Sequence, residues 1–337
     1  MSSVGFAEAI DDAVAERMAV DPAILVFGED VQLIRRNLYT RFGAGRVRNA
    51  PISEAAFLGA AVGAAMAGLR PVVEIMMVDF LTVAIDALVN HAAKLASFSG
   101  GAWSAPMVVR VACGGGYGDG GQHEQSLWGW LAHIPGLIVV VPSNPADAAG
   151  LMRTALVHDG PVVFLEHKLL ADNWLEALGR GGRTGLEFDV PPSGARAARP
   201  LPAAGVPFGS ASVVRSGGNL TLISLGVGVH QALNAAGALA ERGLSAGVVD
   251  LRCVSPLDRG CLVEQVAQTG RVVVVDEDYL TFGLSGEIAA CLLEAGLRPR
   301  FARVATEGTI PFARHLERSA LPNLDRVMRA CQQVLSV

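Results

Sequence analysis

The first half of the chain alternates between helical and extended hydrophobic patterns. Apolar residues recur at helical spacing from Phe6 to Val20, Asp21-Pro22 ends this helix, and a short aliphatic strand runs from Ala23 to Phe27. The same reasoning predicts strands at 71–77, 107–112, 137–141 and 162–165, and helices at 55–69, 80–96 and 145–157. Continuous aliphatic strands that alternate with helices indicate a parallel sheet covered on both faces. The basic stretch 32–49 has no regular period, and we expect an irregular surface segment there.

A second alternation of the same kind begins at residue 220. It predicts strands at 220–224, 246–251 and 272–276, and helices at 229–242, 257–269 and 285–294. Before it, from Gly179 to Pro207, the composition shifts to Gly, Pro, Ala and Arg, which is typical of a linker. We therefore expect an α/β fold of two doubly wound domains, with a first domain at 1–180, a linker at 181–207 and a second domain at 208–337.

A stretch without charge follows Pro51-Ile52-Ser53-Glu54. The 15 residues AAFLGAAVGAAMAGL, from Ala55 to Leu69, repeat small side chains at spacings that let a helix pack closely on all sides, so a buried helix is predicted. Glu54 stands at its N-terminus. A carboxylate there has two interpretations: it stabilises the positive end of the helix dipole, or it is held where water is scarce and acts as an acid or base.

Composition narrows the classes of function. The chain has 337 residues, of which 51% are hydrophobic and 18% charged, so a large partner interface is expected. A net charge of -5 argues against nucleic acid as a main partner, because phosphate binding needs basic clusters and the Arg35-Arg36 pair is too small to form one.

Cysteine usage and the N-terminus point to the cytoplasm. The five cysteines are scattered without CxxC spacing, which predicts reduced thiols and argues against a disulfide framework or a zinc site. Acidic residues in the first turns exclude a signal peptide. The longest uncharged segment, 125–146, is interrupted by Pro135-Gly136 and Pro142, so no membrane helix is expected.

Two glycine patterns resemble cofactor motifs. Gly118-Asp119-Gly120 followed by Asn144 is similar to the motif that holds magnesium and diphosphate in thiamine-diphosphate enzymes, but no strand directly precedes it. A flexible loop is therefore favoured over a metal site. Gly226 and Gly228 open a helix, yet Gln231 stands where GxGxxG needs its third glycine, which argues against a dinucleotide site.

The sequence alone does not decide the roles of two ring side chains, His123 and Phe80. His123 follows the glycine-rich loop 114–121, called the glycine loop below. Its glycines permit close approach of a ligand, so a structural and a catalytic role of His123 are equally supported. Phe80 is a core residue by default, and a stacking platform only if a ring ligand lies beside Glu54. Three other histidines lack such a context and are assigned to packing or to the surface: His91, His133 and His167.

Several of these segments, taken in order, resemble one known family. They are Pro51-Ile52-Ser53-Glu54 with Arg70-Pro71-Val72-Val73-Glu74, Gln122-His123-Glu124-Gln125-Ser126, Ile134-Pro135-Gly136-Leu137, Pro142-Ser143, Asp250-Leu251-Arg252 with Ser255-Pro256-Leu257, Asp276-Glu277-Asp278 and Ile310-Pro311-Phe312-Ala313. The chain is similar throughout to the β subunit of the thiamine-diphosphate-dependent dehydrogenase component of 2-oxo acid dehydrogenase complexes. Pyruvate, branched-chain 2-oxo acid and acetoin dehydrogenases all remain open.

The resemblance implies a transketolase-like pyrimidine-binding domain followed by a transketolase C-terminal-like domain. It implies two α and two β chains that share thiamine diphosphate, with Mg2+ bound on the α subunit and no metal on this chain. Further partners are a lipoyl acyltransferase core and a small 2-oxo acid or acetoin. Some members of the family also hold a monovalent cation at the turn that matches 155–160 here.

Residue roles carry over by position. Glu54 matches the glutamate that hydrogen-bonds the ring nitrogen of the aminopyrimidine, and Phe80 matches the aromatic residue stacked on that ring, with Met76 beside it. His123 matches the histidine that lines the lipoyl channel and helps reductive acylation. Glu29 matches an acidic residue of the buried path between the two active sites.

Three departures from the family pattern stand out. Glu124 replaces a small hydroxyl residue and is expected to add charge near the lipoyl entrance. The segment from Gln32 to Arg36 lacks the glycine turn of the family and is shortened, which weakens the transfer of the family role to Glu29. Phe282 replaces the first of two glycines in the C-terminal half. Two other hypotheses remain: a transketolase-type enzyme with the whole cofactor on one chain, whose diphosphate half is absent here, and a catalytically silent assembly subunit.

Overall fold

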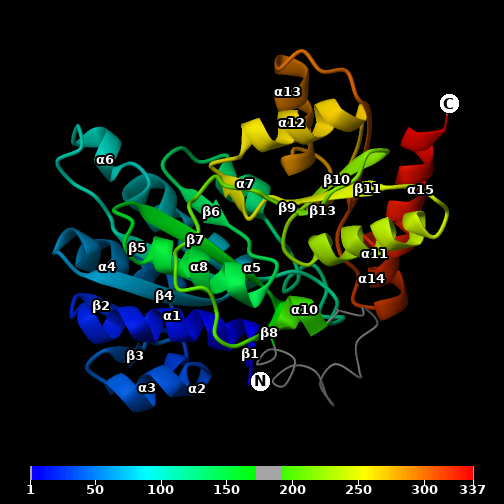
Figure 1. The fold of residues 1–337 in the computed structure, drawn as a ribbon. Helices are drawn as coiled ribbons and strands as arrows, with labels where there is room; N and C mark the ends of the chain where they lie inside the picture. Colours follow the sequence, from blue (N-terminus) through cyan, green and yellow to red (C-terminus); the bar gives the residue numbers. More distant parts are fainter. Residues whose placement is uncertain (1, 172–191, 337) are drawn as a thin grey trace.

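The computed structural model describes residues 2–171 and 192–336 and places them around two mainly parallel sheets (Figure 1). The first sheet has seven strands in the order β12-β6-β7-β5-β4-β2-β3. Its strands are β2 (Ile24–Gly28), β3 (Val47–Asn49), β4 (Arg70–Met77), β5 (Met107–Cys113), β6 (Ile138–Val140), β7 (Pro161–His167) and β12 (Cys253–Ser255). Among these seven described strands, only β12 runs antiparallel to its neighbour. Its chain segment comes from the second half of the sequence, so the two halves share a sheet.

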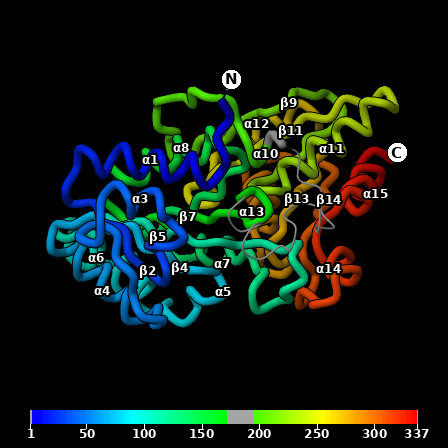
Figure 2. Tube along the Cα trace, turned by 90° about the horizontal axis from the view of Figure 1, so that it is seen from below, coloured from blue at the N-terminus to red at the C-terminus, as the bar shows by residue number. Residues whose placement is uncertain are grey.

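Helices cover both faces of the first sheet. They are α1 (Phe6–Val20), α2 (Val31–Ile34), α3 (Arg36–Phe42), α4 (Glu54–Met66), α5 (Val78–Leu81), the 3-10 turn η1 (Thr82–Ala84), the π-helix η2 (Ala87–Ala92), α6 (Leu95–Phe98), α7 (Trp128–Ala132), α8 (Pro145–Ala155) and the 3-10 turn η3 (Lys168–Leu170). The helices α1 and α8 lie side by side in both views (Figures 1 and 2). The single helix predicted at 80–96 is thus a series of short helical pieces.

The second sheet has five strands in the order β14-β13-β10-β11-β9. They are β9 (Ser212–Arg215), β10 (Leu220–Ser224), β11 (Ala246–Asp250), β13 (Arg271–Tyr279) and β14 (Arg300–Thr306), with helices α11 (Gly228–Ala240), α12 (Arg259–Thr269), α13 (Leu284–Glu294), α14 (Arg314–Ala320) and α15 (Leu324–Leu335). In both views α11, α14 and α15 gather on the side away from α3, α4 and α6 (Figures 1 and 2).

Strand periodicity divides the core into layers. Along β5, Val109 and Val111 enter the cluster under α4, whereas Val108 and Ala112 enter the cluster under α1 and α8. The α4 cluster continues into the second sheet through residues such as Ile223 and Val249. Because the strands are apolar on both faces, they must be covered on both, and the predicted doubly wound arrangement is confirmed.

The helix α4 differs from the sequence prediction. Its residues Phe57, Leu58, Ala61, Val62 and Ala65 are buried, and all five lie on one face. The opposite face is exposed in this chain and carries small residues: Ala55, Ala56, Gly59, Ala60 and Gly63. Burial on all sides was therefore a wrong prediction. The absence of charge from both faces hid the difference, because small residues suit a close helix contact and an uncovered face alike.

Part of the predicted linker has regular structure. The helix α10 (Pro192–Ala195) leads into β8 (Arg196–Ala198), which pairs antiparallel with β1 (Ser3–Gly5) in a separate two-stranded sheet. Arg199 then pairs with Glu8 and Asp12 of α1. The portion of the linker at 181–191 lies outside the described residues. The described portion is thus attached to the first domain by backbone and ionic contacts.

The stretch 32–49 contains α2, α3 and β3 and is in part buried, which corrects the prediction of an irregular surface segment. Arg35, between α2 and α3, is 1% exposed and pairs with Glu74 of β4. Arg110 of β5 is also fully buried and pairs with Asp11 and Glu166. Two arginines and three carboxylates thus form one ionic cluster inside the first domain. A buried guanidinium needs such partners, because an unpaired buried charge is strongly destabilising.

The end of β2 requires a glycine. A Cβ atom added to Gly28 would clash with the backbone carbonyl oxygen of Glu74 in the neighbouring strand β4. We expect Gly28→Ala to destabilise the protein by about 1–3 kcal/mol, because the strands must separate to admit the methyl group. Urea unfolding measures the change. Gly218→Ala is the control, since a Cβ there meets only open space; equal stability of the two variants would contradict the prediction.

In the part of the chain that the structure describes, no helix is both long and apolar enough to cross a membrane.

Candidate functional site

The sequence-predicted site residues follow neighbouring strands of the first sheet. Glu29 follows β2, Phe80 lies in α5 directly after β4, and His123 lies in the loop after β5. Glu54 is the first residue of α4, which follows β3. Since β3, β2, β4 and β5 are adjacent and parallel, their carboxyl ends meet at one edge of the sheet. This edge is where ligands bind in open α/β sheets.

Two carboxylates lie close to each other at this edge. Burial raises the pKa of Glu29, and the nearby charges of Asp30 and Glu54 raise it further. Glu54 itself is only partly buried, and no side chain caps the helix that it begins. Its carboxylate is therefore accessible to a ligand that approaches the N-terminus of α4.

Phe80 and His123 form a ring pair. Their ring centroids are 5.6 Å apart and their planes meet at 82°, an edge-to-face contact. The Nδ1 atom of His123 is buried and has no hydrogen-bond partner within the described chain, while the His123 carbonyl oxygen accepts a bond of 2.6 Å from Lys168 Nζ. Met76 and Phe80 both pack, half-buried, against the core under α1 and α8.

Asp79 is a site residue that sequence reasoning missed. Its Oδ1 atom accepts a 2.7 Å bond from Gln125 Nε2, and Gln125 Oε1 accepts a 3.0 Å bond from the hydroxyl of Tyr279 in β13. The second oxygen, Oδ2, is buried without a partner in the part of the chain described, and burial raises the pKa of Asp79. The signal that could have identified Asp79 from the sequence is its position, directly before Phe80 and just after a predicted strand.

The glycine loop is held in place, which corrects the expectation of a flexible loop. The amide of Gly115 donates to Glu277 Oε1 (2.9 Å), and His167 Nε2 and the Ser126 hydroxyl reach the same oxygen. Glu277 belongs to β13 of the second sheet. His167, assigned to packing or surface, therefore joins the two domains by a buried polar contact. Among residues 2–171 and 192–336, no group of three or more metal-ligating side chains could hold a metal ion.

Glu124 points inward. Its side chain is fully buried and accepts hydrogen bonds from the amides of Tyr117 and Gly120. The prediction that Glu124 adds charge near a lipoyl entrance is therefore wrong. Its carboxyl group lies beneath the loop that contains Tyr117 and Gly120 and is shielded from solvent.

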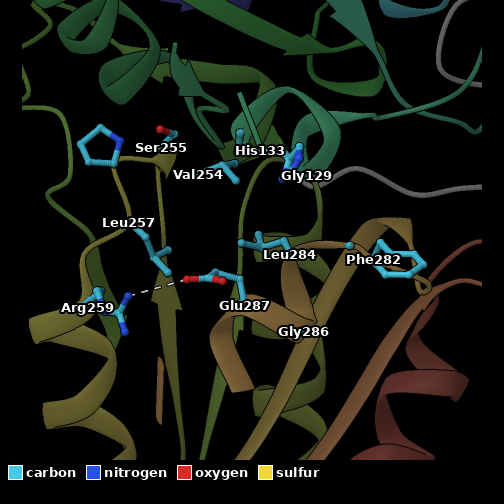
Figure 3. A pocket seen from close by; sticks show the side chains of 13 residues that line it. Gly129, His133, Val254, Ser255, Leu257, Arg259, Phe282, Leu284, Gly286 and Glu287 are labelled. Atoms are coloured by element: carbon cyan, nitrogen blue, oxygen red, sulfur yellow. Dashed lines mark ion pairs between the residues drawn. The ribbon is translucent and has the colours of Figure 1, made fainter. Parts of the chain in front are cut away.

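A cavity of about 740 Å³ lies away from these residues, between α7 and the second domain (Figure 3). Arg259 and Glu287 face each other on one side of it, and Phe282 lies on the other side. Phe282 has φ +59° and is 99% exposed. A glycine adopts that backbone conformation without strain, which explains physically why glycine suits this position better than phenylalanine.

The edge of the sheet carries both an aromatic surface and a carboxylate. Phe80 offers an aromatic surface beside a histidine whose Nδ1 has no partner in the described chain, and Glu54 offers a partly exposed carboxylate. A heteroaromatic ring with nitrogen atoms at its rim can use both a stacking surface and a carboxylate.

Two family models match the chain. The transketolase pyrimidine-binding domain matches residues 2–172, and the transketolase C-terminal domain matches residues 209–327. A solved structure described as a split-gene transketolase, an inactive beta4 tetramer, superposes with a TM-score of 0.79 over 98% of both chains. At 22% identity this likeness shows the fold alone. The predicted fold class is confirmed.

Curated relatives match nearly end to end. The chain is 36% identical to the beta subunit of acetoin:2,6-dichlorophenolindophenol oxidoreductase of Cupriavidus necator, over 97% of this chain and 96% of the relative. It is 35% identical to the 2-oxoisovalerate dehydrogenase subunit beta of Bacillus subtilis, over 99% of each. It is 36% identical to the pyruvate dehydrogenase E1 component subunit beta of Rhizobium meliloti, over 99% of this chain and 70% of the relative.

Proposed function

Because the chain belongs to the family of β subunits of 2-oxo acid and acetoin dehydrogenases, we propose that it is the β subunit of such a thiamine-diphosphate-dependent enzyme. The observation that carries this proposal is the 35–36% identity to three such β subunits over 97–99% of the chain. The open edge of the first sheet supports it, since a site shared with an α subunit must be incomplete in one chain.

The proposed roles are carried over by position from the family resemblance, and the meeting of several of these residues at one edge of the sheet supports them. When bound, the cofactor supplies the electron sink for loss of carbon dioxide from a 2-oxo acid or for cleavage of acetoin. Glu54 holds a proton at the ring nitrogen of the aminopyrimidine, while Phe80 stacks on this ring and Met76 packs beside it. His123 lines the path of the lipoyl arm and assists acyl transfer. Glu29, whose pKa is raised by burial and by the nearby charges of Asp30 and Glu54, belongs to the path that joins the two active sites of the assembled enzyme.

The proposed assembly has two α and two β chains. The α subunit binds the diphosphate of the cofactor and Mg2+, and a lipoyl acyltransferase core accepts the acyl group. On this chain, residues 1–180 form the pyrimidine-binding domain, 181–207 the linker and 208–337 the C-terminal domain. The scattered cysteines fit the cytoplasm.

A substrate assay tests the function. The chain is co-expressed with the α subunit from its own genome, and reduction of an artificial dye is measured with pyruvate, 2-oxoisovalerate or acetoin. We expect one of the three to be turned over, and only with thiamine diphosphate and Mg2+. If a stable α–β complex with bound cofactor reduces the dye with none of them, the proposed function is wrong.

A further inference from the structure

The loop that carries His123 rests on two buried glutamates. Glu124 Oε1 accepts from the amide of Tyr117 (2.7 Å) and Glu124 Oε2 from the amide of Gly120 (3.1 Å). Glu317 Oε1 accepts from the amides of Gly116 (2.7 Å) and Gly118 (3.2 Å). Four loop amides therefore point at two carboxyl groups. Such amides would otherwise be buried without acceptors, at a cost in stability.

The two carboxyl groups are also buried near each other. Both side chains are fully buried, and Glu317 comes from α14 in the second domain. Besides burial, the neighbouring Glu317 side chain contributes to the raised pKa of Glu124, so the two carboxyl groups lie close together, and a hydrogen bond between two carboxyl groups needs a proton. Without that proton, Glu317 Oε2 has no hydrogen-bond partner in the described structure. Burial raises the pKa of Glu124 to about 8, and the bond to Glu317 contributes to this rise.

The charges around the pair do not replace this proton. Lys168 of η3 attracts Glu124, but its Nζ donates to the His123 carbonyl oxygen and lies 5.0 Å over the ring of Tyr117. Burial lowers the pKa of Lys168, and the negative charges of Glu124 and Asp119 oppose this effect.

Two further groups face the loop from the other elements. A Cβ on Gly118 would lie 3.0 Å from Cγ of Arg314, at the start of α14. Glu277 of β13 pairs with His167 and accepts a hydrogen bond from the amide of Gly115. Two ionised glutamates at Glu124 and Glu317 would repel each other, because both carboxyl groups are fully buried.

We propose that Glu124 and Glu317 share one proton and that this pair positions the loop that carries His123. They are positioning residues, because they act on His123 through the backbone of the loop and through Lys168, which binds the His123 carbonyl oxygen. The part of the inference that concerns acyl transfer rests on the proposed function. The part that concerns the loop does not.

The proposal sets the direction of a pH effect. When the loop opens, Glu124 meets water and its pKa returns from about 8 toward its ordinary value of 4.5, so opening releases a proton. The stabilising contribution is complete below about pH 4.5 and is lost as the pH rises to about 8. Over this window, the opening equilibrium constant grows about tenfold for each pH unit and then levels off.

Hydrogen exchange of the loop amides tests the pair in the assembled α–β complex. Exchange of peptides that cover 114–121 is measured from pH 5 to pH 9 and divided by the intrinsic rates, which gives protection factors. In the unchanged protein, protection is expected to fall about tenfold per pH unit up to about pH 8 and then to level off.

Glu317→Gln is the decisive variant. Its amide oxygen can still accept from Gly116 and Gly118, and its NH2 group donates to Glu124 at every pH. The pKa of Glu124 in the closed loop is therefore expected to fall, and protection is expected to level off at a lower pH than in the unchanged protein. Glu124→Gln has one oxygen fewer for two amides, so its protection is expected to be lower at pH 6 than that of Glu317→Gln. The proposal is overturned if protection in Glu317→Gln levels off at the same pH as in the unchanged protein, or if protection in the unchanged protein has no slope against pH.

A functional readout separates this inference from the proposed function. Transfer of the acyl group to a lipoyl domain is compared with dye reduction, which does not need the lipoyl arm. For each enzyme, the rate of acyl transfer at pH 8.5 is divided by the rate at pH 6.5. We expect this ratio to be higher for Glu317→Gln than for the unchanged enzyme. If no substrate is turned over, the function fails while the exchange result still decides the role of the pair.

Discussion

Replacing Glu54 by glutamine in the assembled enzyme is expected to lower kcat with a 2-oxo acid or acetoin by about 10²–10⁴-fold. Glutamine has nearly the same shape but cannot hold and release a proton at the ring nitrogen of the cofactor. Dye reduction at saturating cofactor measures the loss. Because Glu54 is partly exposed and begins α4 without a capping bond, the variant is expected to fold normally.

The matched control for Glu54 is Glu241→Gln, which changes an exposed glutamate of the second domain. The thermal unfolding midpoints of the two variants and of the unchanged enzyme are expected to agree. Full turnover by Glu54→Gln would show that the carboxylate only stabilises the helix N-terminus, which is the structural interpretation that the sequence left open.

The second large effect concerns stability. Arg110→Met removes one of the two guanidinium groups from the buried cluster and leaves Asp11 and Glu166 without it as their partner. Breaking a buried ion pair in this way costs about 3–5 kcal/mol. The apparent Tm is therefore expected to fall by about 10 °C, as measured by thermal unfolding of the purified complex.

Arg242→Met is the control for this variant, because Arg242 is exposed just after the end of α11. It removes an equal charge and is expected to leave the Tm unchanged within about 2 °C. A similar small shift in Arg110→Met would contradict the account, since it would mean that the carboxylates find other partners or take up protons at no cost.

The sequence predicted the central strands because each is a continuous aliphatic run. Edge strands were missed: β14 carries Arg300 and Arg303 among its apolar residues, so its hydrophobic pattern is interrupted. The strands β1, β8 and β12 are each three residues long and are defined by their partners in other parts of the chain. Propensity over such short segments says little, and tertiary contacts decide.

The site was only partly predictable. A resemblance that covers the whole chain pointed to Glu54, Phe80 and His123, and their roles stay predictions. The acceptors of the glycine loop were out of reach of any local pattern, because Gly115 and Glu277 are 162 residues apart and Gly116 and Glu317 are 201 apart. Glu124 is turned inward by the amides of Tyr117 and Gly120, a bonding pattern that the residue type alone does not reveal.

The central claim is that this chain carries half of a shared cofactor site. Calorimetric titration with thiamine diphosphate and Mg2+ tests it most directly, with this chain alone and with the purified α–β complex. We expect saturable binding by the complex and none by the chain alone, because the diphosphate and its metal are held by the α subunit. Tight binding by the chain alone would contradict the account and would return the Gly118-Asp119-Gly120 loop to consideration as a diphosphate site.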